Sequence, residues 1–251
     1  MTREPANGGS AAAFFDLDGT LIPEPSLERR FYQSLKNGQA IPMRNYFFWF
    51  FEATRLLPAG ILRVRYANKS YLTGLNTDLA LEHWTALPFF GEGLERMLWH
   101  AQKGHEIVLV SGTLQPLAEQ AARALECELE ARGEAVRLHI LATRLEESRG
   151  RWTGRLAGEA LYGAAKAKAV AELARTQQWN LSESHAYGNS PLDQDVLTVV
   201  GHGHAVNPGR ELAAIANRQD WPVWHWHQER KAVSRVNSKS VSEVTTLEGQ
   251  A

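Results

Sequence analysis

Short apolar runs alternate along the chain with stretches whose apolar residues have helical spacing. Such runs predict buried strands, and they are "AAAFF", "EIVLV", "VRLHILAT", "SHAYG", "HAVN" and "WPVWHW". Helices are predicted most clearly at residues 114–132 and in the alanine-rich "AAKAKAVAELARTQ". Strands that alternate with helices indicate an α/β fold with a doubly wound, mostly parallel sheet covered on both faces.

Residues 26–87 interrupt this alternation, because their pattern is mostly helical. We interpret them as a cap inserted over the strand ends. Residues 151–156 predict the second half of a small hairpin, since Arg149 and Gly150 are turn residues. The predicted division is a core, a helical cap and two disordered polar tails, at residues 10–22 with 88–230, 23–87, and 1–9 with 232–251.

Composition narrows the class of protein. With 251 residues, 44% of them hydrophobic, the chain has the profile of a globular protein, and a net charge of −1 gives no long-range field that attracts nucleic acid or an anionic membrane. A single cysteine, Cys127, excludes an internal disulfide and fits a reducing compartment, so we expect a cytoplasmic protein. The most apolar segment, residues 46–62, is interrupted by Glu52, Arg55 and Pro58, so we expect no membrane span.

Seven residues that follow predicted strands or, in one case, open the alanine-rich helix are expected at the edge where ligands of parallel sheets bind. They are Asp16, Asp18, Ser111, Gly112, Lys166, Asn189 and Asp193. These residue types suit phosphoryl transfer. One carboxylate can attack phosphorus while a second exchanges protons with the leaving oxygen and water. A hydroxyl, backbone N–H groups and a lysine can hold the phosphoryl oxygens, and Mg²⁺ prefers oxygen ligands.

Four of these segments form an ordered set of motifs. "DLDGT" at 16–20, "VSGT" at 110–113, Lys166 and "GNSPLD" at 188–193 resemble the motifs of the haloacid dehalogenase superfamily of phosphatases. The resemblance is closest to the phosphoserine-phosphatase-like branch, subfamily IB, and covers roughly residues 12–226. Each motif alone also fits a turn, a helix cap or a solvated lysine. Their order and spacing favour the site.

The resemblance implies roles for the acidic residues. Asp16 would be the nucleophile and a ligand of Mg²⁺. Asp18 would be the general acid and base, with its backbone carbonyl as a second ligand. Asn189 stands where the family has a metal-binding aspartate, and Asp193 is the second acid of that motif, which would contribute to the metal site directly or through water.

The remaining roles concern the phosphate. By the same resemblance, Ser111 and the Gly112 N–H would bind phosphoryl oxygens. Lys166 would neutralise the nucleophile and the phosphate. Lys168 is the alternative, and the spacing from Gly163 favours Lys166.

Two departures from the family pattern bear on substrate and metal. Phosphoserine phosphatases have a glutamate just after the first motif, and Glu24 stands one residue early, between two prolines. Their fourth motif reads Gly-Asp-Gly, against Gly-Asn-Ser at 188–190. Both differences count against phosphoserine as the substrate. Because Asn189 brings no charge, we expect weaker Mg²⁺ binding but retained catalysis through Asp16.

Two histidine pairs and an aromatic block have competing interpretations. His202 with His204 and His225 with His227 share strand faces, but no third ligand has suitable spacing, so we interpret them as structural or exposed. The block "YFFWFF" at 46–51 is interpreted as the face by which cap helices pack on one another. The less favoured alternative is a lining for a lipid-like ester or a membrane contact.

These observations predict an Mg²⁺-dependent phosphatase that hydrolyses a small phosphomonoester through phospho-Asp16 and does not bind nucleic acid. A phospholipid or lysophospholipid head-group phosphatase is the alternative enzyme. A weakly active or inactive binding or regulatory protein of the same fold is the alternative outside enzymes, suggested by Asn189. The oligomeric state is left open.

Overall fold

A parallel six-stranded sheet forms the centre of the computed structural model, which describes residues 9–80 and 87–227. The strand order is β3-β2-β1-β6-β7-β8, and every neighbouring pair is parallel. The strands are β1 (Ala12–Phe15), β2 (Glu106–Leu114), β3 (His139–Thr143), β6 (His185–Gly188), β7 (His202–Val206) and β8 (Val223–Trp224). The predicted doubly wound α/β fold is confirmed.

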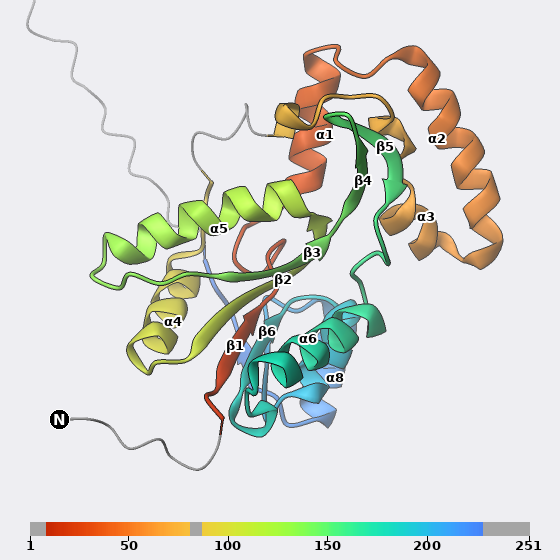
Figure 1. The fold of residues 1–251 in the computed structure, drawn as a ribbon. Coiled ribbons are helices and arrows are strands. Elements are labelled where there is room, and N and C mark those ends of the chain that lie inside the picture. Colours follow the sequence, from red (N-terminus) through yellow and green to blue (C-terminus); the bar gives the residue numbers. More distant parts are fainter. Residues whose placement is uncertain (1–8, 81–86, 228–251) are drawn as a thin grey trace, which may run out of the picture.

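Helices cover both faces of the sheet (Figure 1). Alternate residues of β1 explain this arrangement, because Ala13 and Phe15 join one apolar cluster and Ala12 and Phe14 join the other. The first cluster includes side chains of α4 (Gly91–Gln102) and α5 (Gln115–Glu130). The second includes side chains of α6 (Ala164–Gln177), α7 (Gln194–Val199) and α8 (Arg210–Arg218).

Three helices and three short 3₁₀ segments follow the loop after β1. Ser26 caps the first helix by accepting a hydrogen bond from the Arg29 N–H. The buried face of this helix carries Phe31 and Leu35. The helices are α1 (Leu27–Asn37), α2 (Met43–Leu56) and α3 (Ile61–Ala67), and the 3₁₀ segments are η1 (Leu57–Ala59), η2 (Ser70–Leu72) and η3 (Thr77–Ala80). The 3₁₀ segments η4 (Leu181–Glu183) and η5 (Pro191–Asp193) belong to the core.

The predicted hairpin forms, and it packs against the cap segments. Strands β4 (Leu145–Ser148) and β5 (Arg151–Leu156) are antiparallel. The Gly74 N–H donates to the Trp152 carbonyl at 2.7 Å, and the Trp152 N–H donates to the Leu75 carbonyl at 3.0 Å. The Trp152 ring also meets Phe31 edge to face, with the centroids 6.0 Å apart. The hairpin therefore extends the cap, as Figure 1 shows at the top of the molecule.

The aromatic block of α2 corrects one expectation. Its side chains were expected to pack among the cap helices, but Phe47, Phe48, Phe50 and Phe51 are all exposed. The inward face of α2 is occupied instead by Asn45, whose amide donates to two backbone carbonyls of the segment after α3. The interpretation as an internal packing face is wrong for these four residues.

Other sequence-based expectations fall partly outside the described residues. The two predicted tails, apart from residue 9, and the cap segment 81–86 lie outside the described residues. The boundaries of core and cap stay predictions. Within the described chain, no helix has both the length and the apolarity needed to cross a bilayer.

Candidate active site

A cavity of about 1120 Å³ lies between the carboxyl ends of the strands and the cap. The sequence-predicted residues that line it are Asp16, Asp18, Ser111, Gly112, Lys166 and Asn189. Asp193 is buried next to this cavity and reaches it through Lys166. The structure therefore brings together all seven candidate residues, which come from four segments far apart in the sequence.

Asp16 is the residue that directly follows β1, and it is only 8% exposed. The Lys166 ammonium donates to Asp16 Oδ1 at 2.6 Å, and the Thr20 hydroxyl donates to Oδ2 at 3.1 Å. Burial raises the pKa of the Asp16 carboxyl to about 7; the charge of Asp193 adds to the rise and Lys166 opposes it. This carboxylate is held by a cation but is not fully neutralised by it.

Lys166 is in the first turn of α6 and lies between two carboxylates. Its Nζ is 2.6 Å from Asp16 Oδ1 and 2.7 Å from Asp193 Oδ1. Burial alone would lower the pKa of Lys166, but the two carboxylates outweigh it and raise that pKa, so the ammonium stays charged. Lys168, the alternative from the sequence, is exposed on the same helix.

Asp193 fastens the loop after β6. Its Oδ2 accepts hydrogen bonds from the Asn189 and Ser190 N–H groups and from the Ser190 hydroxyl, at 2.9–3.2 Å. Its Oδ1 accepts from Lys166. Since both oxygens are engaged, the geometry suits a role in positioning Lys166 and the loop. The expected contribution of Asp193 to a metal site stays a prediction.

Gly19, next to Asp18, lies in a tight turn directly against the Asn189 amide. Gly19 has a φ of +86°, and a Cβ there would lie 2.0 Å from Asn189 Nδ2, so only glycine fits. Burial raises the pKa of Asp18 to about 6, against the lowering effect of the Leu27 N–H that donates to Oδ1 at 2.7 Å. A carboxyl with this pKa can hold or release a proton near neutral pH.

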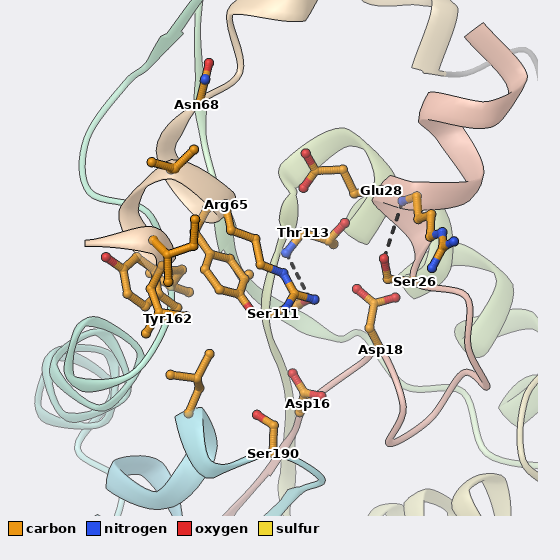
Figure 2. A pocket seen from close by; sticks show the side chains of 18 of the residues that line it. Asp16, Asp18, Ser26, Glu28, Arg65, Asn68, Ser111, Thr113, Tyr162 and Ser190 are labelled. Atoms are coloured by element: carbon orange, nitrogen blue, oxygen red, sulfur yellow. Dashed lines mark hydrogen bonds between the residues drawn. The ribbon is translucent and has the colours of Figure 1, made fainter. Parts of the chain in front are cut away.

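The end of β2 supplies a hydroxyl and a close backbone approach. Ser111 is buried, and its Oγ accepts a hydrogen bond from the Thr113 N–H at 3.2 Å (Figure 2). A Cβ on Gly112 would lie 3.1 Å from the Leu161 carbonyl oxygen and 3.3 Å from the Tyr66 ring. A side chain there would narrow the cavity where the strand meets the cap.

Sequence reasoning missed several residues of the site. Thr20 belongs to the "DLDGT" motif, and its hydroxyl donor could have been inferred from that position. Arg65, Tyr66 and Tyr162 carry no local signal, because the fold alone brings the cap and the loop before α6 to one cavity. Figure 2 shows Arg65 extending from α3 into the cavity, and the rings of Tyr66 and Tyr162 stack with centroids 4.8 Å apart.

The donor set fits a divalent cation. Two carboxylates, those of Asp16 and Asp193, share the ammonium of Lys166, and the carboxylate of Asp18 lines the same cavity without a cationic hydrogen-bond partner among the described residues. Oxygen donors with an excess of negative charge are what Mg²⁺ requires. The groups available to hold it are the Asp16 carboxylate, the Asp18 carbonyl and the Asn189 amide oxygen.

A histidine cluster lies outside the cavity. It shows that spacing along the sequence was not enough to decide which histidines lie close together. Ring nitrogens of His100, His105 and His185 lie within 4.8 Å of one another, because the fold brings His185 beside the other two. His204 belongs to the same cluster, with Nε2 3.1 Å from Nδ1 of His185. Burial and the neighbouring histidines lower the pKa of His100 to about 2, so this ring is neutral and hydrogen-bonded within the core.

The chain matches a protein-family model. The model described as haloacid dehalogenase-like hydrolase matches residues 13–198, which is well over half of the chain and includes every candidate site residue.

Individual proteins are similar over most of their length. A probable phosphatase of Mycobacterium tuberculosis is 29% identical over 255 residues, 95% of this chain and 85% of that protein. A phosphoserine phosphatase of the same organism is 28% identical over 258 residues, 92% of this chain and 75% of that protein. A solved protein of unknown function from Bordetella pertussis has the same fold, with a TM-score of 0.68 at 22% identity over 86% of this chain and 98% of that one.

Proposed function

The chain belongs to the haloacid dehalogenase-like hydrolase family and is a phosphoric monoester hydrolase, and we propose that it transfers the phosphoryl group of its substrate to Asp16 and then to water. The observation that carries this proposal is the placement of Asp16. Its buried carboxylate sits at the floor of the cavity, fixed by Lys166 and Thr20 and backed by Asp193. Such fixation holds a nucleophile in an attacking position.

In the first step, a carboxylate oxygen of Asp16 attacks the phosphorus of the ester. The new Asp16–phosphate bond forms as the bond to the leaving oxygen breaks, and Asp18 gives its proton to that oxygen, which leaves as an alcohol. The raised pKa of Asp18, about 6, makes this proton available near neutral pH. Lys166, the Ser111 hydroxyl and the Gly112 N–H would hold the phosphoryl oxygens during transfer.

In the second step, water replaces Asp16. Asp18, now a carboxylate, takes a proton from water as the water oxygen attacks phosphorus. The Asp16–phosphate bond breaks, inorganic phosphate leaves, and the Asp16 carboxylate is restored. Mg²⁺ held by Asp16, the Asp18 carbonyl and Asn189 would supply charge that offsets the negative phosphate.

The test is phosphate release from an aryl phosphate by the purified chain. We expect turnover with Mg²⁺, loss of turnover when EDTA removes the metal, and recovery when Mg²⁺ is restored. Absence of turnover on a broad panel of phosphate esters would contradict the proposal and favour a binding or regulatory protein of the same fold.

Replacing Asn189 by aspartate tests its place at the metal. Because the amide brings no charge, Asn189→Asp should lower the Mg²⁺ concentration for half-maximal activity by about tenfold or more, on the order of one added charge interaction in a partly buried site. Titration of activity and of the melting temperature with Mg²⁺ measures this.

The matched control for this variant is Asn37→Asp. It adds the same charge at an exposed position in α1. An unchanged Mg²⁺ requirement in Asn189→Asp would mean that this side chain is not a ligand.

A further inference from the structure

The cap carries an exposed apolar surface that the proposed reaction does not use. Nine of the eleven large apolar side chains that are exposed in the described chain lie between residues 43 and 62. Eight of them form what we call the cap apolar face, and the ninth, Trp49, lines the cavity. The cap apolar face consists of Met43, Phe47, Phe48, Phe50, Phe51, Leu57, Ile61 and Leu62.

Half of the cap apolar face lies on one side of α2. Met43, Phe47, Phe50 and Phe51 follow the i, i+4, i+7, i+8 pattern of a helical face. They are 60–72% exposed, whereas Asn45 and Leu56 on the opposite side of α2 are buried. An apolar face of this size on the surface of a folded protein marks a site of interaction.

The cap apolar face is held firmly in place. Asn45 donates to the Tyr71 and Thr73 carbonyls, at 3.0 and 2.8 Å. Asn68, at the end of α3, donates to the Trp49 carbonyl at 2.8 Å. These bonds join α2 and α3 into one unit, which Figure 1 shows at the outer edge of the molecule, away from the sheet.

Charge identifies the kind of surface that this face fits. Residues 43–67 contain four exposed arginines and one acid, Glu52, which is paired with Arg55. Arg44 and Arg63 have no ion-pair partner among the described residues, and Arg65 extends into the cavity. Phenylalanine and leucine flanked by arginine form the composition that lies in the interface of an anionic bilayer.

The position of the cavity separates a bilayer from a second copy of the chain. Ile61 and Leu62 belong both to the cap apolar face and to the cavity lining, and Trp49 lies beside them. A twofold dimer on this face would bring the same arginines together and cover the cavity mouth. A bilayer would pair the arginines with lipid phosphates and leave the mouth open to molecules embedded in it.

The cavity itself suits an amphiphile. Above the catalytic carboxylates its lining is mostly aromatic and aliphatic, from Tyr32, Tyr46, Trp49, Ile61, Leu62, Val64, Tyr66, Tyr71, Leu161 and Tyr162. Of the two acids at the cap side, Glu28 is paired with Lys69 and also accepts from Tyr71, while Glu24 accepts from the Ser26 N–H. A chain of methylene groups would find apolar contacts there.

We propose that the cap apolar face binds an anionic lipid bilayer, and that the cavity accepts the phosphate end of a long-chain phosphomonoester drawn from that bilayer. The docking does not depend on the reaction, whereas the substrate class rests on the proposed function. The cap apolar face therefore orients the mouth of the cavity toward the bilayer that holds the substrate.

Co-sedimentation with vesicles tests the docking. The wild-type chain should sediment with vesicles of equal parts phosphatidylcholine and phosphatidylglycerol, less with pure phosphatidylcholine, and less at high salt. The combined variant Phe47→Ser, Phe50→Ser, Phe51→Ser should bind at least about 100-fold more weakly, because three apolar side chains no longer enter the interface. None of the three lines the cavity, so turnover of a soluble aryl phosphate should be unchanged.

Two further variants serve as controls. Val223→Ser changes an exposed apolar side chain on β8, away from the cap, and should bind vesicles as the wild type does. Arg44→Gln with Arg63→Gln should weaken binding to the anionic vesicles while leaving binding to pure phosphatidylcholine unchanged. Vesicle binding that is absent in the wild type, or equal in the triple variant, would overturn the docking. A dimer that the triple variant abolishes, without vesicle binding, would assign the face to self-association instead.

The length of the substrate's alkyl chain tests the second part of the proposal, the long-chain phosphomonoester. Dodecyl phosphate should be hydrolysed with at least about a tenfold higher kcat/KM than ethyl phosphate, because added methylene groups are buried. Equal values, with aryl phosphate still turned over, would overturn the long-chain substrate and leave the phosphatase proposal standing. No turnover of any ester would contradict the proposed function, and vesicle binding would then be judged on its own result.

Discussion

Asp16→Asn should lower the rate of phosphate release by at least about 10⁴-fold, the order of loss found when a hydrolase loses its nucleophile. The amide oxygen cannot form the phosphoryl bond, so the first step has no acceptor. The fold should remain, since the amide oxygen can still accept the hydrogen bond from Lys166, the amide NH2 can donate to the Thr20 hydroxyl, and the buried charge is removed. Steady-state release of phosphate from an aryl phosphate, beside a thermal melt, measures both effects.

The matched control is Asp195→Asn, two residues after Asp193. Asp195 is exposed in the first turn of α7 and lies outside the cavity. The same change of charge there should leave activity within about twofold, as is usual for surface substitutions. Activity within tenfold of the wild type in Asp16→Asn would mean that another group accepts the phosphoryl group.

Lys166→Met should damage both stability and catalysis. Removing one partner from a buried ion pair costs about 3–5 kcal/mol, and here the loss leaves Asp16 and Asp193 without their shared cation. Loss of an oxygen-binding cation from the transition state should lower kcat by a further factor of about 10²–10³. Urea unfolding in EDTA and kinetics at saturating Mg²⁺ separate the two effects.

The pH dependence of this variant distinguishes charge from packing. The pKa of Asp16 in the folded protein, about 7, is already above its unfolded value of 3.8, and Lys166 opposes that rise. Without Lys166 the pKa rises further, so protonation in the folded state begins at higher pH. The loss of stability should therefore be largest at high pH, above the further raised pKa of Asp16, and shrink as the pH falls through that pKa.

Lys168→Met is the control for this prediction, because it removes an exposed lysine from the same helix. It should change the free energy of unfolding by less than about 0.5 kcal/mol, both at high pH and at low pH. A loss in Lys166→Met that does not vary with pH would mean that the ammonium contributes through packing alone.

The sequence predicted the site because its residues follow local signals. Asp16 comes directly after a buried apolar run, and Lys166 opens a helix after a glycine. Where parallel strands end together, such residues must meet, so the pattern along the chain is enough to bring them to one cavity. The contact of Lys166 with Asp193 follows from this arrangement, although no local pattern indicates its distance.

The cap could not be predicted in the same way. An apolar stripe predicts a helical face but not what the face contacts, and α2 has apolar residues on both sides. The buried pair of Lys69 and Glu28 joins residues 41 apart, which no periodicity shows. The strand predicted in "WPVWHW" shortens to β8, because Pro222 has no N–H and the Trp226 N–H bonds to the Asn207 side chain.

The hairpin β4–β5 has a consequence for anyone who exchanges caps between relatives of this chain. It leaves the core between β3 and α6, yet its backbone pairs with Gly74 and Leu75 and its tryptophan packs on α1. A transplant of residues 23–87 alone would separate Trp152 from its partners and leave their backbone groups unpaired. The unit of modular exchange is therefore two segments, 23–87 together with 145–156, and a chimera that moves both should keep its melting temperature where a single graft would lose it.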